Sequence, residues 1–452
     1  MNPRIISLVF AGSLSLAAMG SSVTAEEKPA KETEKFVPLF NGKDLSGWVP
    51  VNVAPRTFTV KDGMIVSTGK PTGTMRTEKM YENFILELEW RHMVAGGNAG
   101  VFIWGDPITA VGTPFSRGIE VQVLDGRNTD TYTSHGDVFS IWGAKMKPDR
   151  PHPKGAERCL PSERRAKPSP EWNQYRVTCQ DGILKLAVNG KEVSGGSECK
   201  PRKGYICLES EGSECHFRNL KIQELPSTNP KPEEVATEYQ GFTTMYSGLD
   251  LAGWKTDPAN KDHWRAKDWV LFHDGQGEAT DKRFNHLWTE KNYRNFEMVV
   301  DWRMDPKRIT KKKWPLVLPS GDDAVDGDGK VKEVEVDDAG NSGILLRGNE
   351  DAQVNICCRP VGSGEITAFR VNKELPAEIR AGCTPKKRVD AKIGTWNRFV
   401  ITVKGEQVSV ILNGERIIDS VRLPGMPQEG PIGLQQHGEP LEFANLFIRE
   451  LP

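Results

Sequence analysis

The chain repeats itself, and this constrains its fold more than any other feature. Six segments of the first half return in the second half in the same order. LFNGKDLSGW returns as MYSGLDLAGW, YENFILELEWR as YRNFEMVVDWR, and GNAGVFIWG as GNSGILLRG. EWNQYRV, LKLAVNGKEV and CHFRNLKIQELP return as TWNRFVI, VSVILNGERI and EFANLFIRELP. Chance does not produce such an ordered series, so we predict two homologous domains.

The repeats also set the limits of these domains. We predict a first domain at 36–225 and a second at 238–452, joined by a proline-rich, polar linker at 226–237. The second domain carries an additional charged stretch from Lys307 to Asp338. The first domain instead carries additional residues before Trp172. The two copies therefore differ by separate insertions.

Short alternating segments predict strands. Phe84, Leu86, Leu88 and Trp90 recur at every second position, as on a strand with one buried face. The NG dipeptides in LAVNGKEV and VILNGERI follow apolar runs and indicate hairpins. No window longer than a turn or two keeps a helical period. We therefore predict an all-β chain of two tandem antiparallel β-sandwiches.

The N-terminus has the pattern of an export signal. Arg4 precedes an apolar stretch from Ile5 to Met19, and small residues lead to Ala25. We expect a signal peptide at 1–25, a disordered charged arm at 26–35, and an exported protein that is periplasmic or secreted. The apolar run is short for a membrane span, so no span is expected after signal removal.

Charge and cysteine content exclude several classes of function. The formal net charge of −1 leaves no basic field that would recruit nucleic acid. The eight cysteines occur in no CxxC or CxxCH arrangement, so neither a zinc ribbon nor a covalent haem is supported. Disulfides are possible in an exported chain, and their pairing cannot be derived from spacing.

The repeated segments, together with GIEVQVLD in the first half, resemble in order the 3-keto-disaccharide hydrolase domain family. The resemblance implies a concanavalin A-like jelly roll in both halves. It also implies a carbohydrate substrate, no cofactor, and a reaction on glycosides already oxidised to a ketone at C3. A sugar 3-oxidoreductase in the same pathway would supply such a substrate.

The chemistry of that reaction defines the groups to look for. A ketone at C3 acidifies the hydrogen at C2, so a base can remove it and leave an enolate. The enolate then expels the substituent at C1 with the help of an acid. The site therefore needs a base, an acid and a cation or hydrogen-bond donor over the developing oxyanion.

GIEVQVLD contains the strongest candidates. Glu120 and Gln122 are two residues apart and share one strand face, while Asp125 joins that face only if a bulge intervenes. The spacing is similar to the E-x-D-x-x-E strand of laminarinase-type hydrolases, with Gln122 in place of the central acid. The alternative is a solvated strand face followed by a turn aspartate.

Other candidates in the first domain are spread along the chain. Arg91 could neutralise an oxyanion or pair with a structural carboxylate, and His135 could act as a base near neutral pH. Lys167 resembles a basic position of the family. Trp104 and Trp142 could stack on sugar rings, although indoles more often lie in the core.

The second domain departs from this pattern. Gln353, Asn355 and Cys358 stand where Glu120, Gln122 and Asp125 stood, so both acids are lost. Amides bind sugar hydroxyls but do not transfer protons at neutral pH. We interpret this domain as binding or structural, with Gln353, Asn355, Glu365, Arg370 and His437 as candidates for substrate binding. The alternative is a separate active site that uses Glu365 or His437.

Two hypotheses follow. In the first, the first domain is a hydrolase or lyase that cleaves 3-keto-glycosides, with Glu120, Asp125, His135 and Arg91 in catalytic roles. In the second, the tandem domains are a lectin-like protein that binds glycans without altering them. The acids of the first domain favour the enzyme.

Overall fold

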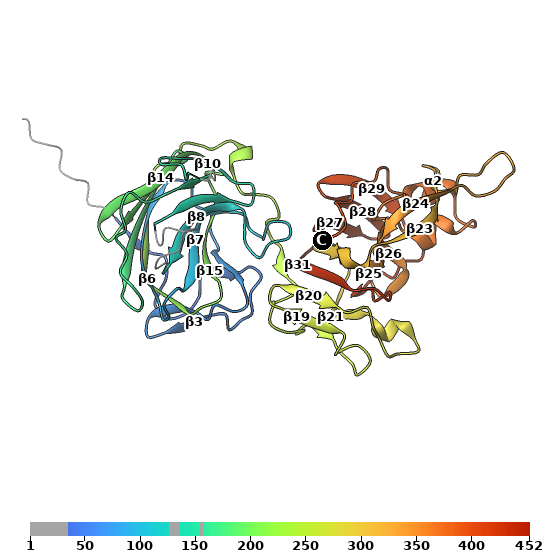
Figure 1. Ribbon diagram of the computed structural model, residues 1–452, viewed down its shortest axis with the longest axis horizontal. Helices are drawn as coiled ribbons and strands as arrows, with labels where there is room; N and C mark the ends of the chain where they lie inside the picture. The colour runs from blue at the N-terminus through green and yellow to red at the C-terminus, as the bar shows by residue number, and fades with distance from the viewer. Residues whose placement is uncertain (1–34, 126–135, 154–156) are drawn as a thin grey trace, which may run out of the picture. The chain divides into compact units, whose positions relative to one another are not determined.

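The computed structural model describes residues 35–125, 136–153 and 157–452. The expected signal peptide, most of the arm at 26–35, and His135 lie outside the described residues. Figure 1 shows β-strands throughout both halves, blue to green in the first and yellow to red in the second. Each half contains paired antiparallel sheets, which confirms the predicted fold class.

The first half forms a sandwich of two sheets, called here the outer and the inner sheet. The outer sheet runs in the order β10 (Lys145–Pro148), β14 (Lys191–Lys200), β13 (Ile183–Val188), β12 (Asn173–Gln180), β6 (Phe84–His92), β16 (Cys215–Glu224), β4 (Met64–Ser67) and β3 (Phe58–Lys61), with β1 (Val37–Pro38) paired to β16. The inner sheet runs in the order β11 (Arg158–Cys159), β9 (Val138–Ile141), β8 (Gly118–Leu124), β7 (Asn98–Gly105), β15 (Tyr205–Ser210), β5 (Gly73–Thr77) and β2 (Trp48–Pro50).

The second half repeats this arrangement. Its outer sheet runs in the order β19 (Trp264–Lys267), β20 (Val270–His273), β31 (Leu441–Glu450), β22 (Phe296–Met304), β27 (Asn397–Lys404), β28 (Gln407–Leu412) and β29 (Glu415–Arg422), with β17 (Thr243–Thr244) paired to β31. Its inner sheet runs in the order β18 (Trp254–Lys255), β21 (Leu287–Tyr293), β30 (Gly430–Leu434), β25 (Asn341–Leu346) and β26 (Asn349–Cys357).

The insertion of the second half folds separately. Within Lys307–Asp338, β23 (Thr310–Pro315) and β24 (Glu333–Asp338) form a two-stranded sheet. The described helices are short: α1 (Thr367–Val371), α2 (Ala377–Gly382) and the 3-10 turns η1 (Pro232–Glu234), η2 (Lys282–Asn285) and η3 (Pro306–Arg308). In the described part of the chain, no helix has the length and apolar character needed to cross a membrane.

The local sequence signals explain these strands. Along β6, buried and half-buried residues alternate from Phe84 onward, as predicted. The NG dipeptides form the β13–β14 and β28–β29 turns, where Asn189, Gly190, Asn413 and Gly414 all have positive φ. A two-residue type I′ turn requires positive φ at both central positions, which asparagine and glycine tolerate best. The predicted hairpins are confirmed.

Each half has its own hydrophobic core between its two sheets. In the first half, side chains of β6 such as Leu88 and Trp90 pack with Val101 of β7 and Val121 of β8. A separate cluster, centred on Trp302 and Phe399, fills the second half. All eight cysteines are buried and none forms a disulfide.

The segment predicted as a linker contains no strand. Ser227 and Thr228 hydrogen-bond to Glu82 of the first half, and Val235 bridges to Lys203. Residues 226–236 are therefore held along the first sandwich by these bonds.

Candidate active site

The strongest group of chemical side chains lies on the inner sheet of the first sandwich, on the face turned away from the core. On β8, Ile119, Val121 and Val123 are fully buried in the core, so Glu120 and Gln122 point to the opposite face. The same alternation on β15 sends Leu208 into the core and places Glu209 on the face of Glu120. Strand alternation thus puts acids from two strands on one surface.

Gly100 of β7 brings these acids together. It pairs with Gln122 of β8 on one side, and on the other side Val101 pairs with Leu208. A Cβ atom placed on Gly100 would lie 2.8 Å from Glu120 Oε1 and 2.8 Å from Glu209 Oε2. The two carboxyl oxygens therefore converge over a position that has room only because the residue is glycine.

A third acid extends the group. Glu211, just beyond β15, accepts a hydrogen bond from Asn98 Nδ2. Asn98 Oδ1 in turn accepts one from Gln122 Nε2 at 2.6 Å, and that Nε2 also donates to the Ala99 carbonyl at 3.3 Å. Gln122 is thus positioned by its amide contacts, and it links the acids of β8 and β15 through Asn98. We call Glu120, Glu209 and Glu211 the acid cluster.

Burial changes the proton affinity of the acid cluster. Glu120 is 7% exposed and Glu209 is 1% exposed. Burial and the charge of Glu211 raise the pKa of Glu120 to about 8, and Arg158 opposes this only in part. Burial and the charges of Glu120 and Glu211 raise the pKa of Glu209 well above its usual range. Burial also raises the pKa of Glu211, against the effect of its bond from Asn98.

Neighbouring groups account for this desolvation. Phe102, Tyr205 and Cys207 form an apolar cluster on the same face, and Phe115 packs edge-on against Phe102 with ring centroids 5.9 Å apart. Glu209 Oε2 is buried and has no hydrogen-bond partner among the residues that the structure describes. An unpartnered buried oxygen favours the neutral carboxyl, because desolvation penalises the charged form. At neutral pH the cluster therefore holds protons that ordinary carboxyls would have lost.

Arg158 of β11 is the nearby cation. It forms a buried ion pair with Asp137, and its guanidinium lies 5.4 Å from the centroid of the Phe139 ring. Phe139 pairs with Glu120 across β8 and β9, so Arg158, Phe139 and Glu120 share one row of the sheet. The sequence analysis did not identify Arg158.

No bulge lies between Glu120 and Asp125. β7 and β8 pair without a register shift from Ile119 to Leu124, so Asp125 stays out of phase with Glu120. Its Oδ2 instead accepts hydrogen bonds from the backbone of Gly96 and Ser169 at 3.3 and 3.4 Å. Asp125 therefore lies at the end of the strand and is separate from the acid cluster.

Arg91 and Lys167 also lie elsewhere. Arg91 belongs to β6 of the outer sheet, where its guanidinium bonds to His216 and lies 4.6 Å from the centroid of the Trp172 ring. Arg91 and Glu120 belong to different sheets, so the structure does not bring Arg91 to the acid cluster. Lys167 is exposed in the segment before β12, and no described contact joins it to the acid cluster.

The two tryptophan candidates have different environments. Trp104 is fully buried and its indole donates to the Glu82 carbonyl, so it is a core residue and cannot stack on a sugar. The backbone of Trp104 has a φ of 56°, which breaks the alternation of β7 and turns the indole into the core. Trp142 follows β9 and is 52% exposed, so its indole remains accessible to a ligand.

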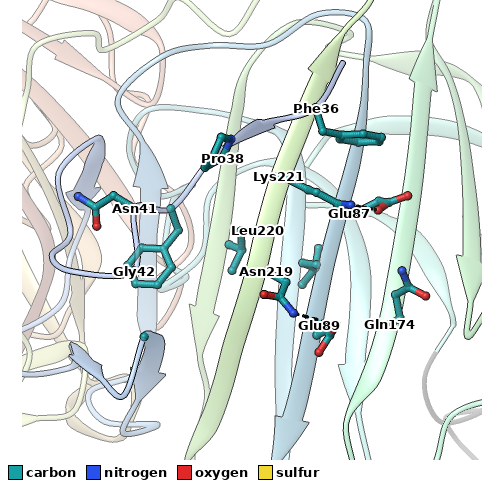
Figure 2. A pocket seen from close by; sticks show the side chains of 13 residues that line it. Phe36, Pro38, Asn41, Gly42, Glu87, Glu89, Gln174, Asn219, Leu220 and Lys221 are labelled. Carbon is teal, nitrogen blue, oxygen red and sulfur yellow. Dashed lines mark hydrogen bonds and ion pairs between the residues drawn. The ribbon is translucent and has the colours of Figure 1, made fainter. Parts of the chain in front are cut away.

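A cavity of about 470 Å³ on the outer sheet is a weaker candidate site (Figure 2). Its acids are already paired: Glu89 accepts from Asn219 Nδ2 at 2.9 Å, and Glu87 forms an ion pair with Lys221 at 2.9 Å. Partial burial acts to raise the pKa of Glu87, but Lys221 and Arg176 outweigh it and hold that pKa below its usual range. Carboxylates held ionised in this way are suited to structural pairing.

Comparison with known proteins supplies the family. A family model described as a 3-keto-alpha-glucoside-1,2-lyase-like domain matches residues 35–223 and 241–449. The chain belongs to this family of lyase-like domains. The two matched segments agree with the predicted resemblance and with two copies of the domain in one chain.

Each of the following relatives matches less than half of this chain. A 3-keto-disaccharide hydrolase of Bacteroides thetaiotaomicron is 26% identical over 247 residues, which is 43% of this chain and 80% of that protein. A Parabacteroides distasonis structure described as a candidate glycosyl hydrolase is 25% identical, with a TM-score of 0.33, and covers 42% of this chain and 94% of its own. The carbohydrate-binding module CBM66 of Bacillus subtilis is 9% identical, with a TM-score of 0.29, and the match covers 40% of this chain and 97% of that module.

The register of the second lyase-like domain confirms the predicted alignment of the two copies. Gly343 pairs with Asn355 as Gly100 pairs with Gln122, and Leu345 pairs with Gln353 as Phe102 pairs with Glu120. Ile344 pairs with Leu434 as Val101 pairs with Leu208. The residue after Leu434, Gln435, therefore takes the place of Glu209, and His437 takes the place of Glu211.

The other candidates of the second lyase-like domain form an ionic network. Glu365 is fully buried and accepts from Arg370 Nε, from Arg359 at 3.2 Å and from Thr367 at 2.8 Å. Arg370 also donates to the Gly321 carbonyl, which ties α1 to the insertion. Cys358 is buried just after β26. A carboxylate with so many donors is a structural anchor.

Sequence reasoning missed Glu209 and Glu211. The signal was present in ICLESE, where the acids alternate with the apolar residues Ile206 and Leu208. The aligned segment of the second copy, GLQQHGE, carries Gln435 and His437 at these positions. A comparison of these segments shows that all three acids of the first copy are replaced in the second copy.

Proposed function

We propose that the first lyase-like domain cleaves the glycosidic bond of glycosides that carry a ketone at C3. The observation that carries the proposal is the convergence of Glu120 and Glu209 over Gly100, with both pKa values raised. Acid–base catalysis is most effective when the pKa of the catalytic group lies near the working pH. A pair of carboxyls that shares protons near neutrality supplies both the base and the acid that this reaction needs.

In the proposed mechanism, ionised Glu120 removes the proton from C2. The electrons of the C2–H bond form the C2=C3 double bond of an enolate, and the neutral carboxyl of Glu209 donates a hydrogen bond to the oxygen at C3. The enolate oxygen then re-forms the C3=O bond, the C2=C3 electron pair forms a C1=C2 double bond, and the C1–O bond breaks with its electron pair on the leaving oxygen. The leaving oxygen takes a proton from the acid cluster, so the elimination is balanced.

The fate of the resulting enone decides the type of reaction. Addition of water at C1 makes the overall reaction a hydrolysis, and release of the enone makes it an elimination. We further propose that the protein acts outside the cytoplasm, in the periplasm or as a secreted protein, and that a sugar 3-oxidoreductase supplies the ketone. The N-terminal sequence pattern supports export.

The direct test is release of aglycone from a chromogenic 3-keto-glucoside by the full chain. We expect Glu120→Gln and Glu209→Gln to lower kcat by about 100-fold or more, because general acid–base catalysis contributes at least this factor. Glu87→Gln, on the outer sheet, is the matched control and should keep wild-type turnover. The unoxidised parent glucoside should not react.

Undiminished turnover in both glutamine variants would place the chemistry elsewhere. A wild-type protein that binds keto- and parent glycosides but cleaves neither would favour the alternative, a glycan-binding protein without catalysis. For the inner sheet of the second lyase-like domain, the sequence favours binding without catalysis, because amides and a histidine replace the three acids there.

A further inference from the structure

The inner sheet of the second lyase-like domain carries a surface that has no acids where the first domain has three. Gln353, Gln435 and His437 occupy the register positions of Glu120, Glu209 and Glu211. The replacement is coordinated, since every member of the acid cluster changes to an amide or an imidazole. This removes proton transfer by carboxyls from these three positions and keeps groups that form hydrogen bonds.

The two amides bond to each other. Gln353 Nε2 donates to Gln435 Oε1 at 2.5 Å and to the Ser342 carbonyl at 3.2 Å. Gln353 Oε1 and Gln435 Nε2 have no hydrogen-bond partner among the described residues, and both side chains are partly exposed. The pair therefore presents one acceptor and one donor to the outside, as hydroxyl groups of a sugar require.

An aromatic ring lies on β21, the strand next to β30 and Gln435, and the fully buried Leu345 separates it from Gln353 in the same row of the sheet. Trp288 of β21 packs on the backbone of Gly433, where an added Cβ would come within 2.7 Å of the indole. The equivalent positions in the first domain are Arg76 and Cys207, so the indole has room only in the second copy. Trp288 is partly exposed and its Nε1 already donates to the Arg283 carbonyl. The remaining exposed part of the ring is apolar.

The cover of this surface also differs between the copies. In the first domain, the connection between β7 and β8 is long enough to place Phe115 over Phe102. In the second domain, β25 and β26 are joined by Arg347 and Gly348 alone. Leu345 stands where Phe102 stands and is still fully buried, whereas Trp288, Gln353 and Gln435 are partly exposed.

We propose that Trp288, Gln353 and Gln435 form a non-catalytic binding site for a neutral pyranose ring. The indole would support the apolar C–H face of the ring, and the free amide oxygen and nitrogen would bind its hydroxyls. A small set of directed polar groups beside an aromatic surface is the usual composition of a small-molecule site. The unoxidised sugar is a suitable ligand, because nothing in this site depends on a ketone.

The test measures binding of trehalose and cellobiose, neither of which is oxidised at C3, by saturation-transfer NMR and calorimetry on the full chain. We expect at least one of the two to bind, and Trp288→Ala to weaken its affinity at least 10-fold. Trp288→Phe should retain part of the affinity, and Gln435→Leu should lose most of it. Trp172→Ala removes a partly buried indole from the outer sheet of the first domain and should bind as wild type.

A double variant, Glu120→Gln with Glu209→Gln, separates this site from the proposed active site. It should bind the sugar with wild-type affinity even if it has lost all turnover. Loss of binding in that double variant, with retention in Trp288→Ala, would assign the ligand to the first domain and overturn the proposal. Absence of binding of both sugars to wild-type protein would also overturn it, whatever the outcome of the aglycone assay.

Discussion

Glu120→Gln should change how the stability of the protein depends on pH. The substitution replaces a buried carboxyl by a neutral amide of the same shape, and the second domain already has glutamine at the equivalent position. Glu209 would then face an amide, which can accept or donate a hydrogen bond. The variant therefore removes proton binding by Glu120, and with it the charge that helps to raise the pKa of Glu209, with little change in packing.

The raised pKa sets the size and the sign of the effect. The pKa of Glu120 is 4.5 in an ordinary environment and about 8 in the folded protein. Between pH 4.5 and about pH 8, the folded protein therefore holds a proton on Glu120 that the unfolded chain has released. This contribution to stability is complete below pH 4.5 and is lost as the pH rises toward 8. The loss is about 1.4 kcal/mol per pH unit, or about 5 kcal/mol over the whole interval. The Glu120→Gln variant carries no titrating group at this position, so it should not show this loss of stability with rising pH.

Thermal unfolding followed by circular dichroism between pH 3 and 8.5 measures this effect. A change of 1 kcal/mol shifts Tm by about 2–4 °C in a domain of this size. The Tm of Glu120→Gln relative to wild type should therefore rise by about 3–5 °C per pH unit. Glu87→Gln is the control with the opposite sign, because Lys221 and Arg176 hold the pKa of Glu87 below its usual range. It should lose stability relative to wild type as the pH rises from 3 to 5.

Parallel pH profiles for wild type and Glu120→Gln would refute the reasoning. They would mean that Glu120 titrates as an exposed carboxyl, and that the acid cluster is hydrated. The proposed sharing of protons near neutral pH would then lose its basis.

Three further substitutions test the assignments around the site. Gly100→Ala should reduce kcat at least 10-fold and destabilise the fold by about 1–3 kcal/mol, since the added methyl displaces two buried carboxyls; wild-type kinetics would contradict the geometry. Trp104→Ala should lower the free energy of unfolding in urea by about 3–5 kcal/mol, because a buried indole leaves a cavity. Arg91→Ala should leave kcat/KM for a 3-keto-glucoside within about twofold of wild type, as expected for a surface substitution away from the site. A 100-fold loss would return Arg91 to the mechanism.

Much of the fold could be predicted because its signals are local. A strand with one buried face shows a period of two, as in β6, and a type I′ hairpin needs asparagine and glycine, as at Asn189–Gly190. The same period correctly placed Glu120 and Gln122 on one face. Strand alternation does not hold at Trp104, where a positive φ turns the side chain into the core. It does hold at Asp125, which stays out of phase with Glu120 because no bulge forms.

The sequence by itself determined the duplication, the sandwich class and the loss of acids from the strand aligned with GIEVQVLD. Only the tertiary structure decided that Glu209 joins Glu120, because β15 lies next to β7 in the sheet although it is far away in the chain. It also decided that Arg91 lies on the other sheet. Alternation along a strand specifies the face of a side chain, but the order of strands, and with it the neighbours and the burial that raise a pKa, depends on long-range packing.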